Sequence, residues 1–272
     1  MIQDGIHYGI PESVYRADPA YSYSRVKLAT GTMAEYREAM LNPKPPSEAM
    51  IVGTLIDSLV FGSMAGECVL KPEPRAPNGW RDEVLASGKY PVTKDNQSSA
   101  EGCAAALNRH RAASRFLKST GASQVSMFIT HEGVRLKARI DRVPAKSTAL
   151  VDLKKCQDAS PGRIVTREDG STYEPLPKWS YDMRDFCYHM QAGLYLWMWN
   201  KLAGTEDRRE HWVHVCVEEK PPHLVNVFQM GQRSIDEGEK LFFDTLAKIR
   251  ACEASGEWPG YPDEVTVAEV AQ

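Results

Sequence analysis

The sequence predicts an α/β protein of the α+β type, in which helices flank a mixed central β-sheet. Segments 134–141 and 149–154 alternate apolar and polar residues with the period of two that marks a strand. Segments 211–218 and 224–230 are typical of two further strands, whereas 181–201 is a long, strongly apolar helical stretch. A chain of 272 residues can form one large domain or two small ones.

The segment 134–155 predicts a β-hairpin with its turn at 144–147, the sequence Pro-Ala-Lys-Ser. If this hairpin is symmetric about Lys146 and Ser147, Asp141 lies directly opposite Asp152 on the neighbouring strand. The Cβ atoms of opposed residues on antiparallel strands are about 4.5–5.5 Å apart. Two carboxylates at that distance repel each other unless a cation lies between them.

Oxygen ligands on a rigid sheet are those that Mg²⁺ or Mn²⁺ prefers, so Asp141 and Asp152 are candidate metal ligands. Lys154 points to the same side of its strand as Asp152 and supplies an ammonium group that could orient a water or neutralise a phosphate. An ordinary hairpin with mixed charge on its outer face is the simpler alternative. The opposed aspartates and the apolar run Ala149–Leu153 support a metal site about as strongly as an ordinary hairpin.

Helices are predicted at 24–41, 47–61, 101–118, 181–201 and 234–254, with Ser24 and Ser234 as helix N-caps. Gly53, Thr54 and Asp57 share one face of the second helix. Arg184, Tyr188, Gln191 and Tyr195 form a polar stripe along the fourth. This stripe either faces a cleft or is the wet side of an amphipathic helix. Arg109, His110, Arg111 and Arg115 lie on the polar side of the third helix, where a solvated face is the simpler interpretation and phosphate contact an alternative.

We expect one domain over 1–272, with a core at about 24–254 and surface excursions at about 66–100 and 157–179. Residues 1–23 look loop-like and the C-terminal tail frayed. A strand at 125–130 leads into the hairpin through His131 to Gly133.

Charge is distributed unevenly although the net charge is only −3. The stretch 135–163 carries eight Lys/Arg and three Asp, and the chain from residue 206 onward carries seven Lys/Arg and fourteen Asp/Glu. This polarity concentrates positive potential around the hairpin. The six cysteines form no C-x-x-C pair, which argues against a zinc ribbon, an iron–sulfur cluster and a disulfide framework. The longest apolar run, near 194–199, is too short to span a membrane, and we expect a cytoplasmic protein.

Five motifs in order resemble the RecE-type exonucleases, the exodeoxyribonuclease VIII family of phages and prophages within the PD-(D/E)XK nuclease superfamily. They are VYRADPAYSYSRVK at 14–27, GTLIDSLVFG at 53–62, LKARID at 136–141, LVDLKK at 150–155 and YHMQAGLYLW at 188–197. The likeness covers most of 10–200 and is weaker beyond. It implies the PD-(D/E)XK restriction-endonuclease-like core.

The resemblance implies a Mg²⁺-dependent, or Mn²⁺-dependent, 5′→3′ exodeoxyribonuclease that acts on double-stranded DNA ends in the bacterial host cell. Such an enzyme leaves 3′ overhangs for a single-strand annealing protein and forms a ring-like homo-oligomer, a trimer or tetramer. By position, Asp141 and Asp152, with the backbone carbonyl of Leu153, hold the metal and Lys154 helps to position the attacking water. Gln191 and Tyr195 shape the site and contact DNA. Candidate DNA-binding residues around the hairpin and the following helix are Arg135, Lys137, Arg139, Lys155, Tyr188, Gln191 and Tyr195.

The sequence departs from the family at two positions. Asp57 stands where the family usually has a metal-proximal His, and we expect it to be a third metal ligand. Gln124 or Ser126 stands where a further acidic residue is common, which would weaken a second metal site. Two alternatives remain open: a catalytically impaired relative that binds DNA ends or a recombination partner without cleaving, and an α/β protein unrelated to nucleic acid.

Overall fold

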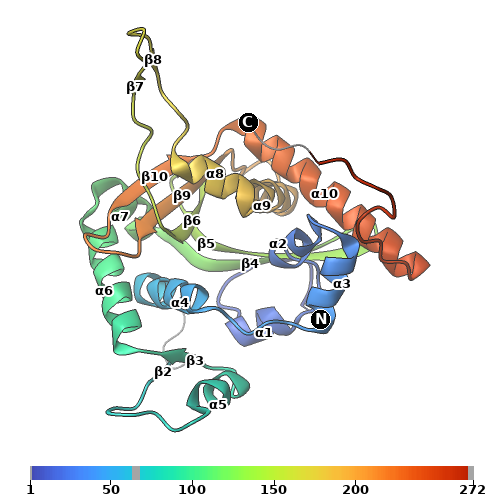
Figure 1. Ribbon diagram of the computed structural model, residues 1–272, viewed down its shortest axis with the longest axis horizontal. Coiled ribbons are helices and arrows are strands. Elements are labelled where there is room, and N and C mark those ends of the chain that lie inside the picture. Colours follow the sequence, from blue (N-terminus) through green and yellow to red (C-terminus); the bar gives the residue numbers. More distant parts are fainter. Residues whose placement is uncertain (1, 63–67, 269–272) are drawn as a thin grey trace.

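The computed structural model describes residues 2–62 and 68–268 and contains a six-stranded mixed sheet (Figure 1). The strands lie in the order β1 (Gly5–His7), β4 (Gly121–His131), β5 (Val134–Pro144), β6 (Ala149–Cys156), β9 (His211–Glu218) and β10 (Val225–Gln229). Within this sheet, as far as the structure describes the chain, β6 and β9 are parallel and the other neighbouring strands are antiparallel. This sheet confirms the predicted fold class.

Helices cover both faces of the sheet, and each face has its own apolar core. Helices α4 (Glu48–Phe61), α6 (Lys94–Arg109) and α7 (Arg111–Lys118) pack on β6 and β9 through residues such as Ile56, Leu107 and Val151. On the other face lie α2 (Tyr23–Val26), α3 (Met33–Leu41), α9 (Tyr188–Ala203) and α10 (Gln232–Ser255). Burial of apolar surface on both faces is the main stabilising contribution to such a layered fold.

The predicted hairpin forms, with its turn after Pro144, but its two strands separate soon after the turn. Arg142 and Val151 are the one residue pair that the β5–β6 ladder records, and Asp141 and Asp152 are the next positions on the two strands. Farther along β5, Tyr21 takes the place of β6, because its N–H donates to the Arg135 carbonyl and its carbonyl accepts from the Lys137 N–H. Asp141 and Asp152 therefore lie where the sheet forks.

Several predicted helices are interrupted. The stretch 24–41 divides into α2, the 3₁₀ turn η1 (Lys27–Ala29) and α3, because Thr32 forms a capping box with Glu35 and starts a new helix. Ser22 caps α2 in place of Ser24, and α10 begins after Gly231 without the predicted Ser234 cap.

Helix breaks also divide 101–118 and 181–201. His110 ends α6 with extended backbone, and its ring accepts the Ala113 N–H at the start of α7. Cys187, in a left-handed conformation, separates α8 (Lys178–Asp185) from α9. Arg184 therefore lies in α8 and does not share the stripe of Tyr188, Gln191 and Tyr195.

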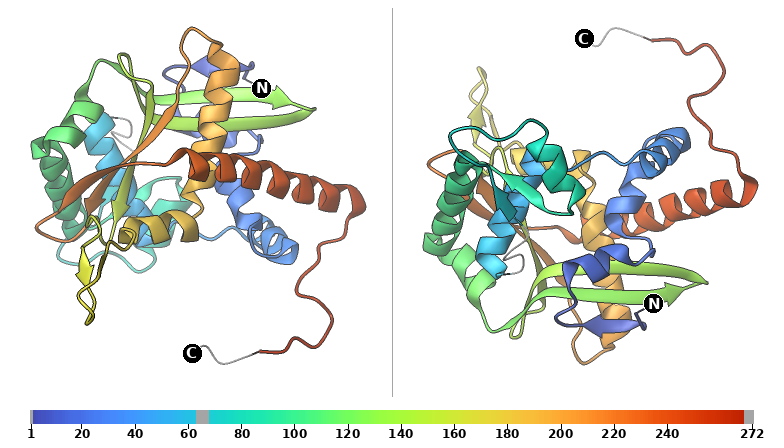
Figure 2. Two further views of the ribbon diagram at one scale, coloured as in Figure 1. Left: turned by 90° about the horizontal axis from the view of Figure 1, so that it is seen from above. Right: turned by 90° about the horizontal axis from the view of Figure 1, so that it is seen from below.

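The N-terminal segment is ordered, in contrast to the predicted loop. It contributes β1 and α1 (Glu12–Ala17), and its contacts use the polar face of β5. The tail was also expected to fray, but the Trp258 ring stacks on Tyr36 at 5.9 Å. Farther along, the tail extends away from the body (Figure 2).

Two excursions project from this core. The first holds β2 (Cys68–Leu70), α5 (Trp80–Ala86) and β3 (Tyr90–Val92). The second carries the small hairpin of β7 (Val165–Thr166) and β8 (Thr172–Tyr173), which projects well beyond the sheet (Figure 1). None of the helices within 2–62 and 68–268 combines the length and apolarity that crossing a membrane requires.

Candidate active site

Asp152 is the central residue of the candidate site. It is 2% exposed on β6 and is held from two sides. The Gln191 Nε2 on α9 donates a hydrogen bond of 2.8 Å to Asp152 Oδ1. The Lys154 Nζ forms an ion pair with Oδ2 at 2.6 Å. Buried charge is costly without such partners, so these contacts fix the carboxylate in one position.

Asp141 faces the same region from β5. Its Oδ2 accepts a 2.9 Å hydrogen bond from the Leu153 N–H, a backbone donor that has lost its partner strand where the sheet forks. Desolvation raises the pKa of Asp141 to about 7, and the charge of Asp152 adds to this shift. In the metal-free protein this carboxyl group is therefore half protonated near neutral pH.

Asp57 reaches the site from α4. Ser47 caps this helix, as its predicted start at residue 47 requires, and Gly62 ends it. Desolvation raises the pKa of Asp57 well above its ordinary value, followed in size by the charge of Asp141. Asp57 and Thr54 both line a cavity of about 350 Å³ beside the start of α1, whereas Gly53, which was predicted on the same helix face, does not line it.

Lys154 lies between the carboxylates and an aromatic surface. Desolvation lowers the pKa of its ammonium group, but Asp152, Tyr188 and Asp141 outweigh this and raise the pKa above its ordinary value. Its Nζ lies 4.9 Å from the centroid of the Tyr188 ring. Lys154 is therefore a cation at neutral pH.

The residues present fit a divalent cation that two carboxylates hold. In the described part of the chain, no three His, Cys, Asp or Glu side chains are grouped so that one metal ion could join them. The structure thus does not gather Asp57, Asp141 and Asp152 into one cage. Mg²⁺ usually binds through one or two carboxylates and otherwise keeps waters and phosphate oxygens. Asp141 and Asp152, whose mutual repulsion is plain in the pKa of Asp141, match that requirement.

Gln191 and Tyr195 lie beneath the carboxylates and not on the surface, since each is 6% exposed. Their predicted role in shaping the site agrees with this position. Direct contact of Tyr195 with DNA does not, because its ring packs edge-on against Trp212 at 5.6 Å.

The cations of β5 hold the N-terminal segment in place. Arg135 pairs with Asp4 and Asp18, and Arg139 with Glu12. The Lys137 Nζ donates to the carbonyls of Tyr15, Arg16 and Asp18. Lys155 pairs with Glu219. The structure therefore gives these four predicted DNA contacts internal partners, which the local alternation of charge could not reveal.

His214 is a site residue that the sequence did not indicate. It is the cross-strand neighbour of Asp152 on β9, and its Nε2 lies 3.9 Å from Asp152 Oδ2. Trp212 Nε1 donates to that same Nε2 at 2.9 Å, which assigns the imidazole proton to Nδ1. Desolvation, followed by Lys154, lowers the pKa of His214 well below its ordinary value, so the ring is neutral. The sequence signal that could have indicated His214 was its position two residues after Trp212, since this spacing puts both side chains on one face of a buried strand.

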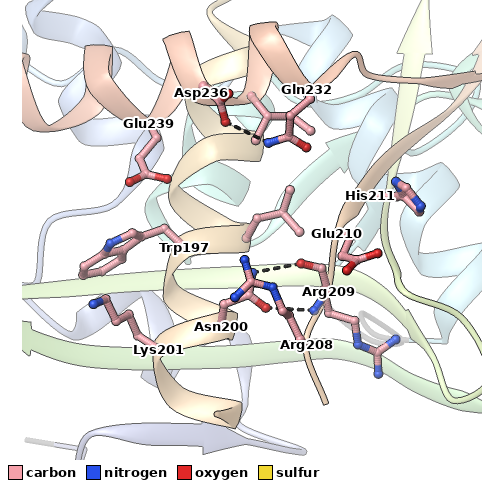
Figure 3. A pocket seen from close by; sticks show the side chains of 12 residues that line it. Trp197, Asn200, Lys201, Arg208, Arg209, Glu210, His211, Gln232, Asp236 and Glu239 are labelled. Carbon is pink, nitrogen blue, oxygen red and sulfur yellow. Dashed lines mark hydrogen bonds between the residues drawn. The ribbon is translucent and has the colours of Figure 1, made fainter. Parts of the chain in front are cut away.

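A separate pocket of about 670 Å³ lies between α9 and α10 (Figure 3). Its lining mixes cations such as Lys201 with carboxylates such as Asp236 and Glu239, and Gln232 donates to Asp236 within it. It contains none of the predicted site residues.

The forked sheet, the aspartates at the fork and the lysine two residues after the second aspartate define a domain of the PD-(D/E)XK nuclease superfamily. The chain belongs to the family described as PDDEXK-like domain of unknown function (DUF3799), whose model matches residues 22–269. A search of curated proteins found no match.

One solved structure supports the fold. The crystal structure of a "Putative exonuclease" from Eubacterium rectale is similar over 97% of each chain, with a TM-score of 0.64 and 16% sequence identity. A second structure, that of SSO0001, covers 73% of this chain and 84% of its own, with 13% identity and a TM-score of 0.27, and it carries no argument.

Proposed function

We propose that this protein is a metal-dependent exodeoxyribonuclease that digests double-stranded DNA from its ends in the 5′→3′ direction. The convergence of Asp141, Asp152 and Lys154 at the fork of the sheet is the observation that carries this proposal. The structurally similar protein from Eubacterium rectale is described as a "Putative exonuclease", which agrees with this proposal.

The site residues divide the work of phosphodiester hydrolysis. A divalent ion held by Asp141 and Asp152, with the Leu153 carbonyl, supplies Lewis acidity and neutralises phosphate charge when it is bound. Lys154 keeps a fixed positive charge beside the carboxylates and positions the attacking water and the scissile phosphate. Gln191 holds Asp152 in place, and Asp57 adds a further carboxyl group on the α4 side, with its pKa raised by burial and by Asp141.

The direction of digestion and the biological setting come from the resemblance to RecE-type enzymes. On that basis the 3′ overhangs serve phage-type recombination by strand annealing, with a single-strand annealing protein as partner. The same resemblance supports a ring-like trimer or tetramer and action in the cytoplasm of a bacterial host.

A second candidate is a catalytically impaired relative that binds DNA ends. Two observations favour it: Asp57 replaces the usual His, and neutral Gln124 lies beside Asp141 in place of an acid.

A comparison of linear and covalently closed circular duplex DNA, each with Mg²⁺, tests the proposal. An exonuclease degrades the linear form and leaves the circle intact. Degradation of both forms contradicts the exonuclease assignment. Binding of linear DNA without degradation, with Mg²⁺ or Mn²⁺, supports the impaired relative.

A further inference from the structure

One face of the protein carries five exposed cations. Arg109 ends α6, Arg111, Arg115 and Lys118 follow on α7, and Lys146 lies in the turn between β5 and β6. They line two adjoining cavities of about 890 and 630 Å³, which share Arg111, Arg115 and Ser119. The sequence could not separate a phosphate-binding role from a solvated face for this helix.

This face has no acidic counterpart. The sequence has no Asp or Glu between Gly102 and His131, or between Arg142 and Val151. Of the ion pairs within 2–62 and 68–268, none includes any of the five cations. Like charges four residues apart, such as Arg111 and Arg115, repel each other and destabilise a helix. An anionic partner would remove that cost.

The basic face continues to the rim of the candidate active site. Arg142 donates to the Ser119 carbonyl and, at 2.8 Å, to the Ser123 hydroxyl. Ser119 lines both basic cavities, whereas Ser123 lines the cavity that contains Asp57. Four residues of extended chain span about 13 Å, so the two regions adjoin. Arg142 itself is buried, and these two hydrogen bonds join the regions from beneath.

We propose that this face, which we call the α7 basic face (Arg109, Arg111, Arg115, Lys118 and Lys146), binds the phosphate backbone of duplex DNA beyond the reacting nucleotide. This inference rests on the proposed function and names how the same enzyme holds its substrate. Duplex DNA carries one negative charge per about 1.7 Å of axis. Arg111 and Lys118 are about 10 Å apart along the helix, a length that covers several phosphates. The contacts are to backbone and therefore independent of base sequence.

The test compares two triple variants that each remove three positive charges. Arg111→Gln/Arg115→Gln/Lys118→Gln alters the α7 basic face, and Arg233→Gln/Lys240→Gln/Lys248→Gln removes three exposed charges from α10 as the control. Binding to a duplex of about 30 base pairs is measured without divalent metal at about 50–200 mM salt. For the α7 variant the slope of log K against log salt becomes shallower by about two to three, since each lost phosphate contact removes about 0.9.

Digestion with Mg²⁺ of a blunt duplex that is too short to reach the α7 basic face from the active site separates this inference from the proposed function. The α7 variant keeps the wild-type kcat/KM on this short substrate but loses it on the long duplex. Absence of digestion of both the short and the long duplex by the wild type contradicts the nuclease proposal, while the salt slopes still test the surface.

Unchanged salt slopes, or an equal change in the α10 control, overturn the inference and point to an acidic protein as the partner of this face. Arg111→Lys/Arg115→Lys guards against a folding defect, because it keeps the charge. Retention of duplex binding by this variant supports the inference, and its loss contradicts a purely electrostatic contact.

Discussion

Gln191 and Asp152 lie 39 residues apart in the chain, and the Gln191 amide donates to the Asp152 carboxylate across 2.8 Å. The hydrogen bond joins α9 on one face of the sheet to β6 within it. Gln191 Oε1 is buried and accepts no hydrogen bond. The amide nitrogen of Gln191 therefore holds the carboxylate while its amide oxygen stays without a partner among the described residues, which is typical of a positioning residue.

Replacing Gln191 tests this role. Gln191→Ala leaves Asp152 free to turn, and we expect activity or metal affinity to fall about 10- to 100-fold. Gln191→Glu places a like charge beside Asp152 and lowers activity further. Thermal unfolding with and without Mg²⁺ serves as the second readout, since a merely structural role would lower stability equally in both conditions.

Lys154 gives a prediction about charge. Lys154→Met leaves the buried Asp152 without its cation, and losing one partner of such a pair costs about 3–5 kcal/mol. We expect a lower unfolding temperature without metal, partial recovery on adding Mg²⁺ or Mn²⁺, and loss of DNA hydrolysis. Lys154→Arg keeps the charge and controls for it. An active Lys154→Met protein would show that the ammonium group has no part in hydrolysis.

The raised pKa of Asp141 predicts how the stability of the metal-free protein depends on pH. Its pKa is about 7 in the folded chain and near 3.9 when unfolded, so the folded state binds more protons between these values. The group therefore stabilises the fold at low pH, and its contribution is lost as the pH rises through about 7. Unfolding with EDTA between about pH 4 and pH 8 measures this loss, at most about 1.4 kcal/mol per pH unit.

Asp141→Asn is the matched variant for the pH series. It should show a flatter dependence and exceed the wild type in stability at alkaline pH without metal. Parallel curves for the two proteins would contradict the assigned protonation. With Mg²⁺ present, the wild type should recover stability at alkaline pH, since the cation replaces the lost proton.

Gln124 offers a test of the departure from the family. It interrupts the β4–β5 ladder between Val125 and Ser123, its φ is +52°, and its side chain lies close enough to Asp141 to lower the pKa of that carboxyl group. Gln124→Glu adds a third carboxyl group beside Asp141. We expect tighter Mg²⁺ binding in calorimetry and lower stability in EDTA, because the added charge is repelled until metal binds. Gln124→Met is the neutral control, and equal Mg²⁺ affinity in both variants would contradict a place for this side chain near the ion.

The local signals were sufficient for the hairpin and the two aspartates. Alternation along 134–141 and 149–154 defined both strands, and the turn defined their register, which Arg142 and Val151 confirm. The helix breaks at Thr32, His110 and Cys187 were missed, because each depends on one capping side chain or one left-handed residue. These breaks decide which side chains share a helix face.

Contacts between distant segments were beyond local patterns. The polar row of β5 looked solvent-facing, yet it binds the N-terminal segment more than one hundred residues away in sequence. His214 became part of the site only through the parallel pairing of β6 with β9. Tertiary pairing, which no short motif encodes, decided both outcomes.

End-specific release of label tests the central claim most directly. Pure protein with Mg²⁺ is incubated with linear duplex DNA labelled at the 5′ or the 3′ end, beside an EDTA control and the Asp152→Ala variant. We predict immediate release of 5′ label in small products, abolished by EDTA and by the substitution. Undiminished digestion by Asp152→Ala would contradict the site, and release of 3′ label first would contradict the direction.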